Sequence, residues 1–440
     1  MRECEAAQLL APHAAIAGQT CRSAAIGEFF WCIVKPRFML LPGELAPDWG
    51  SSLALARIRG RLMKTVTTFN FLAIQTLILA TALAAPSLAE PAAGQANPAA
   101  SFATLEAAEN AANAQPGPRN VPARSIPVPG TVSPEVLALI AAPYRVPAWD
   151  ANPKSPEEWK ELVATLAARG AAAQPRIREK LGVTMQPAVI GGVKSFILAP
   201  TVIPDANRNR LLVHVHGGGY VYNPGEAGTG EAALMAAYGG FKVISFDYRM
   251  PPDAPYPAAM DDAMAVWKAA LQMQEPRNMA IFGTSTGGGM TLAMILRAKQ
   301  EHLPLPAAIA PGTPWSDLTE TGDTYKTNEW LDNVLVSYNG YLSHAAKLYA
   351  NGHDLKDPQL SPIYGDFHGF PPAILTSGTR DLFLSNTVLT HRKLRQAGVE
   401  AVLQVFEGLS HAQYLFDPNA PETKEAFTEI AQFFDAHLGR

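Results

Sequence analysis

The first residue that could do chemistry is a serine set among glycines, in the stretch AIFGTSTGGGM at 280–290. An apolar run leads into Ser285 and a helical pattern follows it, which places Gly283-x-Ser285-x-Gly287 at a turn from a strand to a helix. Glycines on both sides let the backbone bend sharply there, so that the hydroxyl stands exposed above the sheet. The pattern predicts a nucleophilic serine; a glycine-rich helix start that only packs is the alternative.

A phosphate-binding loop does not fit the same glycines. No Lys follows them as a Walker loop requires, and their spacing is not the Gly-x-Gly-x-x-Gly of a dinucleotide site. We therefore expect neither a nucleotide nor another cofactor at this turn.

A second glycine motif, His216-Gly217-Gly218-Gly219, follows the apolar run LLVHV. Residues without side chains let backbone N–H groups come close to an oxygen, which is needed when a serine attacks a carbonyl and that oxygen becomes negative. The N–H of Thr286, next to the serine, would supply a further donor. Together the two motifs indicate acyl transfer.

A nucleophilic serine needs a base, and the chain order expected for this kind of sheet is nucleophile, acid, histidine. His411 follows the apolar run AVLQVFEG in a loop, where a base should lie. The acid should follow the preceding strand, and PAILTSGTRD ends in Asp381 there. Glu407 is the second candidate acid, but a strand end four residues from His411 is a poor position for it. The remaining histidines after Ser285 lie in helical patterns or in and before an inserted segment: His302, His344, His353, His368, His391 and His437.

The pair His214-x-His216 offers a different chemistry. Two histidines at strand spacing point to one side of a sheet and begin many metal-hydrolase sites. No further cluster of His or carboxylate residues with ligand spacing accompanies them in the sequence. We therefore expect no metal, and we assign His216 to pinning the glycine loop through its ring.

Beyond Gly182 the sequence alternates apolar runs with helical stretches, which predicts an α/β fold with a mostly parallel sheet covered by helices on both faces. Two helices precede these strands, with starts at Ser133-Pro134 and Ser155-Pro156. Tryptophans, tyrosines and polar turns interrupt the alternation from 315 to 371. We expect an inserted helical lid there.

The N-terminal part reads differently from the rest. Residues 63–89 have a basic start, an apolar centre and a small-x-small end, which predicts a secretory signal peptide cleaved before Glu90. A transmembrane anchor is the alternative, although the apolar centre is short for a span. Residues 1–62 would then be a mis-assigned start or an untranslated leader, and Met63 the working start. The Ala- and Pro-rich residues 90–129 are expected to form a flexible linker with little order.

Composition narrows the classes of partner. The 440 residues are 48% hydrophobic and 17% charged, as in a globular protein with a sizeable core. All three cysteines lie before residue 33, so the exported chain would have neither disulfide nor thiolate chemistry. From Glu90 onward 27 Lys and Arg face 34 Asp and Glu, a formal charge of −7, which predicts no nucleic acid partner and no stable membrane insertion. The expected partner is a small ester, and a homodimer is compatible with the sequence.

With these motifs in place, residues from about 130 to 440 resemble the hormone-sensitive-lipase-like α/β-hydrolases, the bacterial family IV carboxylesterases. DYRMPPDAPYPAAMDD at 247–262 and PQLSPIYGDFHGFPP at 358–372 are also similar to segments of that family. The resemblance implies an α/β-hydrolase core with a cap built from about 130–182 and 315–365. It also implies hydrolysis of short- to medium-chain esters through an acyl-enzyme intermediate.

Carried onto matching positions, the resemblance implies a triad of Ser285, Asp381 and His411. It implies oxyanion donors at Gly218, Gly219 and Thr286, with Gly217 as the hinge of the loop. The chain departs from the family where the usual Gly-Asp-Ser-Ala-Gly is Gly-Thr-Ser-Thr-Gly, and where Asp-Pro-Leu is Asp-Leu-Phe. Thr286 adds bulk beside the serine, so a narrower acyl or alcohol pocket is expected. Lactone opening, deacetylation, and ligand binding without catalysis remain as alternatives.

Overall fold

The computed structural model describes residues 98–113, 117–118, 120–144 and 149–439. The predicted leader at 1–62 and the predicted signal peptide at 63–89 lie outside the described residues. The chain divides into two compact units, 1–119 and 120–440, and each is described by itself.

The described part of the first unit contains one helix, α1 (Pro98–Asn113). Little order was expected across 90–129, and the structure differs from this at 98–113, whereas the described residues 117–118 and 120–129 form no helix or strand. The helix has seven alanines together with Leu and Glu, all strong helix formers, and its only proline is its first residue. Its apolar residues do not gather on one face to make a core, and Phe102 and Leu105 are exposed.

The second unit is built on one eight-stranded sheet in the order β1-β2-β4-β3-β5-β6-β7-β8. The hairpin of β1 and β2 joins the sheet antiparallel, and every pairing from β4 to β8 is parallel. This confirms the predicted mostly parallel sheet. The strands are β1 (Val183–Ile190), β2 (Val193–Pro200), β3 (Leu211–Val215), β4 (Lys242–Phe246), β5 (Met279–Thr284), β6 (Ala308–Gly312), β7 (Ala373–Gly378) and β8 (Ala401–Phe406).

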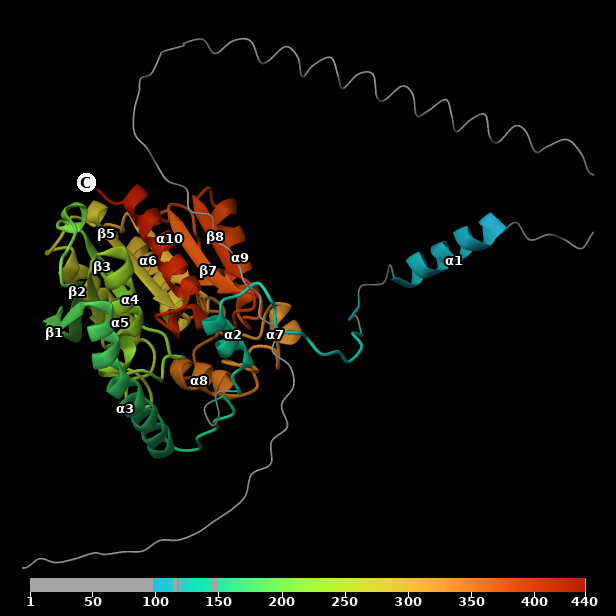
Figure 1. Ribbon diagram of the computed structural model, residues 1–440, viewed down its shortest axis with the longest axis horizontal. Helices are drawn as coiled ribbons and strands as arrows, with labels where there is room; N and C mark the ends of the chain where they lie inside the picture. Colours follow the sequence, from blue (N-terminus) through green and yellow to red (C-terminus); the bar gives the residue numbers. More distant parts are fainter. Residues whose placement is uncertain (1–97, 114–116, 119, 145–148, 440) are drawn as a thin grey trace, which may run out of the picture. The chain divides into compact units, whose positions relative to one another are not determined.

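Helices cover both faces of this sheet (Figure 1). One face packs against α4 (Gly230–Gly239) and α10 (Pro421–His437), and the other against α5 (Ala258–Ala270), α6 (Thr286–Gln300) and α9 (Leu384–Gln396). Successive residues of β3 alternate between the two cores, because side chains along a strand point to opposite faces. Leu212 belongs to one apolar cluster, while Leu211 and Val213 belong to the other.

The helices expected before the sheet and within the insertion are present. Ser133 caps α2 (Pro134–Ala141) by accepting from the N–H of Val136, and Ser155 caps α3 (Pro156–Leu181) by accepting from Glu158. The insertion contains α7 (Thr324–Thr327) and α8 (Tyr341–Ala350). Short 3-10 turns complete the unit at Asp205–Asn207, Gly225–Thr229, Pro276–Asn278, Pro362–Tyr364 and Gln413–Leu415.

Strand β1 was not predicted. It lies at the edge of the sheet, has one buried residue in eight, and contains Pro187, so it has none of the continuous apolar character of the inner strands. Pairing with β2 over its full length, rather than burial, defines it.

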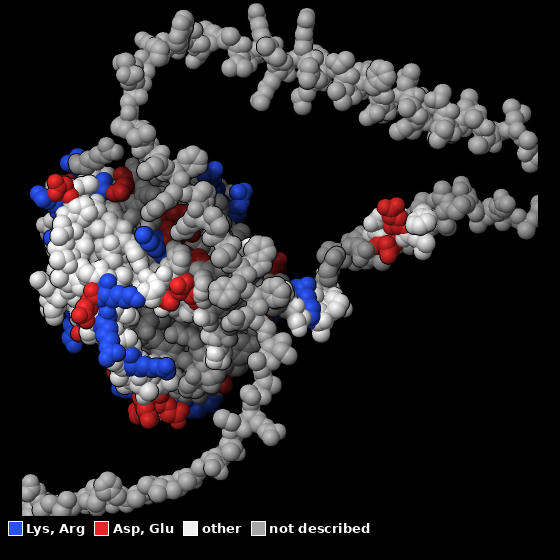
Figure 2. Space-filling model, in the orientation of Figure 1, with Lys and Arg blue, Asp and Glu red and all other residues white. Residues whose placement is uncertain are grey.

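Two further features concern the charges on the surface and the apolar content of the helices. Figure 2 shows Lys and Arg interspersed with Asp and Glu on one face of the second unit. Among the described residues, no helix has the length and apolar content needed to cross a bilayer.

Candidate active site

Ser285 sits in a strained turn between β5 and α6. Its backbone has φ 65° and ψ −122°, a conformation that costs free energy for any residue with a side chain. Three backbone hydrogen bonds hold it there. Its own N–H donates to the carbonyl of Gly312 at 2.9 Å, and its carbonyl accepts from the N–H groups of Trp315 at 2.9 Å and Gly289 at 3.0 Å. The turn is therefore fixed by β6, by the segment after it and by the first turn of α6.

The glycines flanking Ser285 are required by close packing of backbones. A Cβ added to Gly283 or Gly287 would stand 2.1 or 2.0 Å from the carbonyl oxygen of Val215 on β3. Only glycine lets the turn approach β3 this closely. The two glycines of the Gly-x-Ser-x-Gly pattern are therefore required by the fold at this turn, whereas the nucleophilic role of Ser285 stays a prediction.

The glycine loop after β3 lies directly against the serine. A Cβ on Gly217 would be 3.2 Å from the Cβ of Ser285, and Gly218 and Gly219 have φ values of 131° and 65°. Among the described residues, no group accepts a hydrogen bond from the backbone N–H of Gly218, Gly219 or Thr286. These three N–H groups are therefore unpaired within the described part of the chain, and that of Thr286 directly follows the serine.

His216 pins this loop, as its position in the sequence suggested. Its Nδ1 is 3.0 Å from the carbonyl oxygen of Gly217, and its ring stacks on Tyr248 at 4.1 Å. The Tyr248 hydroxyl donates to the His216 carbonyl at 2.9 Å. Burial lowers the pKa of His216 to about 4, so the ring is neutral at physiological pH.

His214, the other half of the metal alternative, uses both ring nitrogens within the protein. Its Nδ1 is 2.9 Å from Ser245 Oγ, and its Nε2 is 3.1 Å from Glu231 Oε2. No group of three or more potential metal ligands gathers anywhere in the described residues.

Asp381 and His411 form a buried pair. His411 Nδ1 is 2.9 Å from Asp381 Oδ1, and the carboxylate also accepts from Ser377 Oγ at 2.7 Å and from the N–H of Phe383 at 2.8 Å. His411 Nε2 is buried and has no partner among the described residues. It is thus left to exchange a proton with a group in the site. Glu407, the second candidate acid, is exposed.

The site residues follow the ends of parallel strands at one edge of the sheet. Gly217 follows β3, Ser285 follows β5, Asp381 follows β7 and His411 follows β8. In the described residues no hydrogen bond joins Ser285 to His411, and such contacts are often long before substrate binds. A nearby bond does join the two loops. Thr284 Oγ1, next to the serine, is 2.7 Å from the hydroxyl of Tyr414, three residues after His411.

Known proteins are similar to this chain in sequence and in fold. A family model described as alpha/beta hydrolase fold matches residues 212–415. The crystal structure of an esterase is 40% identical with a TM-score of 0.71, covering 73% of this chain and 99% of that one. Another, of an esterase from the bacterial hormone-sensitive lipase family, is 26% identical with a TM-score of 0.56, covering 66% and 100%. An acetyl-hydrolase of Streptomyces hygroscopicus is 27% identical over 55% of this chain and 80% of its own.

The chain belongs to the hormone-sensitive-lipase-like α/β-hydrolases. It is an ester-cleaving enzyme of that family, as its relatives are. The α/β-hydrolase fold expected from the sequence is confirmed.

A buried polar network beneath the serine of this esterase was not predicted. Glu231 of α4 accepts from Thr284 Oγ1 at 2.7 Å through one oxygen and faces His214 through the other. An Asp at position 284, usual in the family, would place a second carboxylate against Glu231, whereas a threonine donates to it. Thr284, which replaces the usual Asp of the family pattern, therefore has a hydrogen-bond partner in α4, the carboxylate of Glu231.

The second threonine of the Gly-Thr-Ser-Thr-Gly pattern is placed differently from the expectation. The Thr286 side chain is completely buried at the start of α6, so it has no surface open to a pocket. The expectation that Thr286 narrows the acyl or alcohol pocket has no support in this structure.

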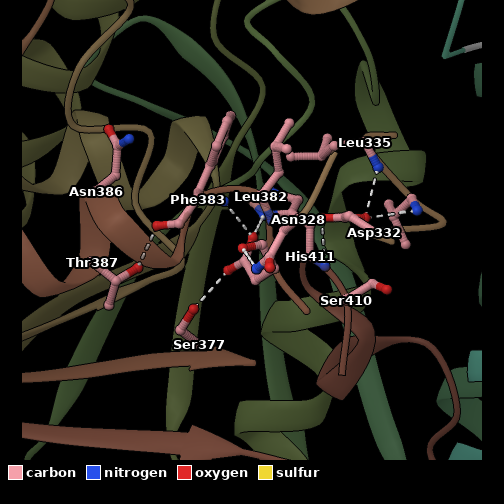
Figure 3. Close-up of polar contacts among 12 residues, drawn as sticks. Asn328, Asp332, Leu335, Ser377, Leu382, Phe383, Asn386, Thr387, Ser410 and His411 are labelled. Atoms are coloured by element: carbon pink, nitrogen blue, oxygen red, sulfur yellow. Dashed lines mark hydrogen bonds and ion pairs between the residues drawn. The ribbon is translucent and has the colours of Figure 1, made fainter. Parts of the chain in front are cut away.

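Other groups around the acid and base were also missed (Figure 3). Ser377 binds the Asp381 carboxylate, Asn328 donates to the carbonyl of Asp381 at 2.8 Å, and Asp332 accepts from the N–H of His411 at 3.2 Å. Ser377 could have been noticed, because it lies four residues before Asp381 on the same strand end. Asn328 and Asp332 lie in the insertion, about fifty residues away, and carry no motif.

Proposed function

We propose that this esterase is a serine hydrolase, which cleaves short- to medium-chain carboxylic esters through an acyl-enzyme on Ser285. The observation that carries the proposal is the state of His411. Its Nδ1 is held by a buried carboxylate, and its buried Nε2 has no partner among the described residues. The bond from Thr284 to Tyr414 joins its loop to the strained turn that carries Ser285. A carboxylate on Nδ1 fixes the tautomer that leaves Nε2 able to accept a proton.

In the first half of the reaction, Ser285 Oγ attacks the ester carbonyl while His411 Nε2 takes its proton. The carbonyl oxygen becomes negative and is bound by the N–H groups of Gly218, Gly219 and Thr286. The Asp381 carboxylate stabilises the imidazolium that forms. As the intermediate collapses, His411 returns the proton to the leaving alcohol, and the acyl group stays on Ser285.

In the second half, His411 takes a proton from a water molecule, which attacks the acyl-enzyme. The same three N–H groups bind the oxyanion again, and the proton returns to Ser285 as the carboxylic acid leaves. The position of Asp381, fully buried and bound by three donors, keeps its charge fixed beside the ring through both halves.

The substrate class has support from the relatives rather than from a motif. A relative named acetyl-hydrolase favours a short acyl group. Lactone opening and deacetylation of a sugar or drug would use the same triad. p-Nitrophenyl acetate, butyrate, hexanoate and octanoate, measured beside lactones and acetylated sugars, rank these options by kcat/KM.

The matched variant for that panel is Ser285→Ala. We expect a loss of turnover of five or more orders of magnitude on every substrate that wild type cleaves, with the melting temperature almost unchanged. Activity that survives in the alanine variant would contradict the serine mechanism. A wild type that binds esters but cleaves none would favour a ligand-binding relative, against which the intact Asp381–His411 pair speaks.

We also propose that the esterase is exported to the periplasm or medium, with residues 63–89 as its signal peptide. The basic start, apolar centre and small-x-small end support this. The mass of the exported protein should correspond to a chain beginning at Glu90. A peptide containing Cys21 or Cys32 in that sample would contradict both the cleavage and the assigned start.

We propose further that the esterase forms a homodimer. Strand β8 is the last strand of its sheet, so its outer backbone groups pair with no further strand among the described residues and could pair with a second copy. Val402 and Val405, on opposite faces of this strand, are exposed. Light scattering gives the mass in solution, and a monomer across the working concentration range would contradict this.

A further inference from the structure

Asp332 is a completely buried carboxylate between α7 and α8, far in sequence from the acid and the base. Its two oxygens have different partners (Figure 3). Oδ1 accepts from the N–H groups of Val334 and Leu335, at 2.8 and 3.0 Å, and so closes the turn of its own segment. Oδ2 accepts from the N–H of Leu382 at 2.8 Å and from the N–H of His411 at 3.2 Å.

The second oxygen therefore joins both loops of the acid–base pair. Leu382 directly follows Asp381, and the other donor is the backbone of His411 itself. The two loops also meet directly, because the N–H of Arg380 donates to the carbonyl of Leu409 at 3.0 Å and the N–H of Gly408 donates to Thr379 Oγ1 at 2.8 Å. What Asp332 adds is a bond to the backbone of His411 itself and to the residue after Asp381, so it constrains the two residues whose side chains meet at 2.9 Å.

Asn333, the residue after Asp332, extends these hydrogen bonds to helix α2. Asn333 receives a hydrogen bond from Gln413 Nε2 at 2.8 Å and donates to the carbonyls of Leu139 and Ala142 at the end of α2, at 2.8 and 2.9 Å. Its own N–H donates to Ser410 Oγ at 3.2 Å. The segment is thus held between α2 and the His411 loop, so Asp332 has little freedom to move.

All four partners of Asp332 donate, which the ionised carboxylate satisfies and a neutral acid or amide does not. The titratable groups that face it are Asp381 and His411. The pKa of Asp332 is raised above its ordinary value, because burial and the charge of Asp381 outweigh the opposite influence of His411 and the N–H groups. An ionised Asp332 adds a second negative charge near the imidazolium that forms during catalysis.

We propose that Asp332 is a positioning residue, which ties the Asp381 and His411 loops together and so holds the acid–base pair in register for proton transfer. This rests on the proposed serine mechanism. Because a displacement of about 1 Å in a reacting group can cost a hundredfold, loss of the tie should lower kcat by about ten- to a hundredfold. Substrate contacts do not involve Asp332, so KM should change by less than about threefold.

The test is Asp332→Asn with Asp317→Asn as its matched control. Asp317 is a buried aspartate of the same insertion, which likewise accepts from a backbone N–H two residues on, at 2.9 Å from Thr319, but contacts neither loop of the pair. We expect kcat of Asp332→Asn on p-nitrophenyl butyrate to fall as stated. We also expect the acid limb of its kcat/KM profile to move to lower pH, because a charge that favours imidazolium is gone. Asp317→Asn should keep kcat within twofold and leave the limb in place.

Asp332→Ser tests the roles of the two carboxylate oxygens of Asp332 separately. A serine hydroxyl can still accept from the turn N–H groups but cannot reach Leu382 or His411, so the local turn survives and the tie is lost. Its kcat should fall as far as that of Asp332→Asn. The proposal is overturned if both Asp332 variants keep kcat within twofold, or if they lose no more than Asp317→Asn with an unmoved acid limb. It is also overturned if both fail to fold while Asp317→Asn folds, since Asp332 would then be needed for folding alone.

Labelling of wild type and the variants with a phosphonate distinguishes a failure of the serine mechanism from a failure of the positioning role of Asp332. If Ser285 is not labelled, the serine mechanism fails whatever Asp332 does. If Ser285 is labelled and the Asp332 variants react as fast as wild type, only the positioning role fails.

Discussion

The proposed nucleophile and the proposed base of this enzyme are held in place by different means. Around Ser285 the functional groups are backbone atoms and one hydroxyl, placed by a tight turn and by three glycines of one loop. Around His411 the functional groups are side chains, held by Ser377 and Asp381 at the end of β7 and by Asp332 from the insertion. The first side depends on local chain geometry, and the second on contacts across the sequence.

The difference teaches where each kind of change should hurt. On the nucleophile side a substitution matters when it moves the backbone, even if the new side chain does no chemistry. On the base side a substitution matters when it changes a carboxylate or its donors, even with the backbone in place. The following variants test this contrast.

The largest effect is expected for Asp381→Asn on the base side. An amide in place of the carboxylate favours the wrong tautomer of His411, and such a change costs about ten thousandfold in kcat. Glu407→Gln is the matched control, because Glu407 was the second candidate acid and is exposed. Steady-state kinetics should show a near-normal Glu407→Gln; the opposite pattern would transfer the acid role to Glu407.

Gly218→Ala comes next and breaks the nucleophile side through its backbone. A Cβ would stand 2.5 Å from the carbonyl oxygen of Tyr222, at a φ of 131°, so the loop must move. Displacing an oxyanion donor should lower kcat by about a hundred- to a thousandfold. Gly225→Ala is the control, since its φ is also positive but its Cβ would meet nothing within 4 Å. Equal turnover in the two variants would show that the loop N–H groups do not bind the oxyanion.

A stability effect is expected from His216. Its pKa is about 4 in the folded protein and about 6.5 when unfolded, so between these values the unfolded chain binds more protons. The free energy of unfolding should therefore decrease as pH falls from about 6.5 to about 4. His216 should account for roughly 2 to 3 kcal/mol of this decrease. Urea unfolding at pH 7 and pH 4.5 should show a smaller difference for His216→Gln than for wild type. Equal differences would mean that His216 is not buried as a neutral ring.

The smallest effect is expected for Thr286→Ala. The N–H remains, and the side chain is buried away from open space, so kcat/KM should change by less than about threefold for acetyl to octanoyl esters. If the variant cleaves long acyl esters better than wild type does, the result would instead support the expectation from the sequence that Thr286 narrows the pocket. A uniform collapse would assign the hydroxyl a part in catalysis.

The same contrast explains how much could be predicted from sequence. Ser285 and the loop at 216–219 were found because their glycines are contiguous, and local backbone geometry leaves a local pattern. His411 and Asp381 were placed only by chain order and strand ends. Three residues of the site could not be found in the sequence, because each contacts a partner more than fifty residues away along the chain. They are Asp332, Asn328 and Glu231. The inner strands were predicted by their apolar runs, whereas β1 at the edge has no such run.

The most direct test of the central claim is a phosphonate reaction followed by peptide mass spectrometry. A p-nitrophenyl alkylphosphonate should add one equivalent per chain, with activity lost in parallel and the added mass on the peptide containing Ser285. The Ser285→Ala protein should stay unlabelled. Modification of another residue, or full activity after one equivalent has reacted, would contradict the assignment of Ser285 as the nucleophile.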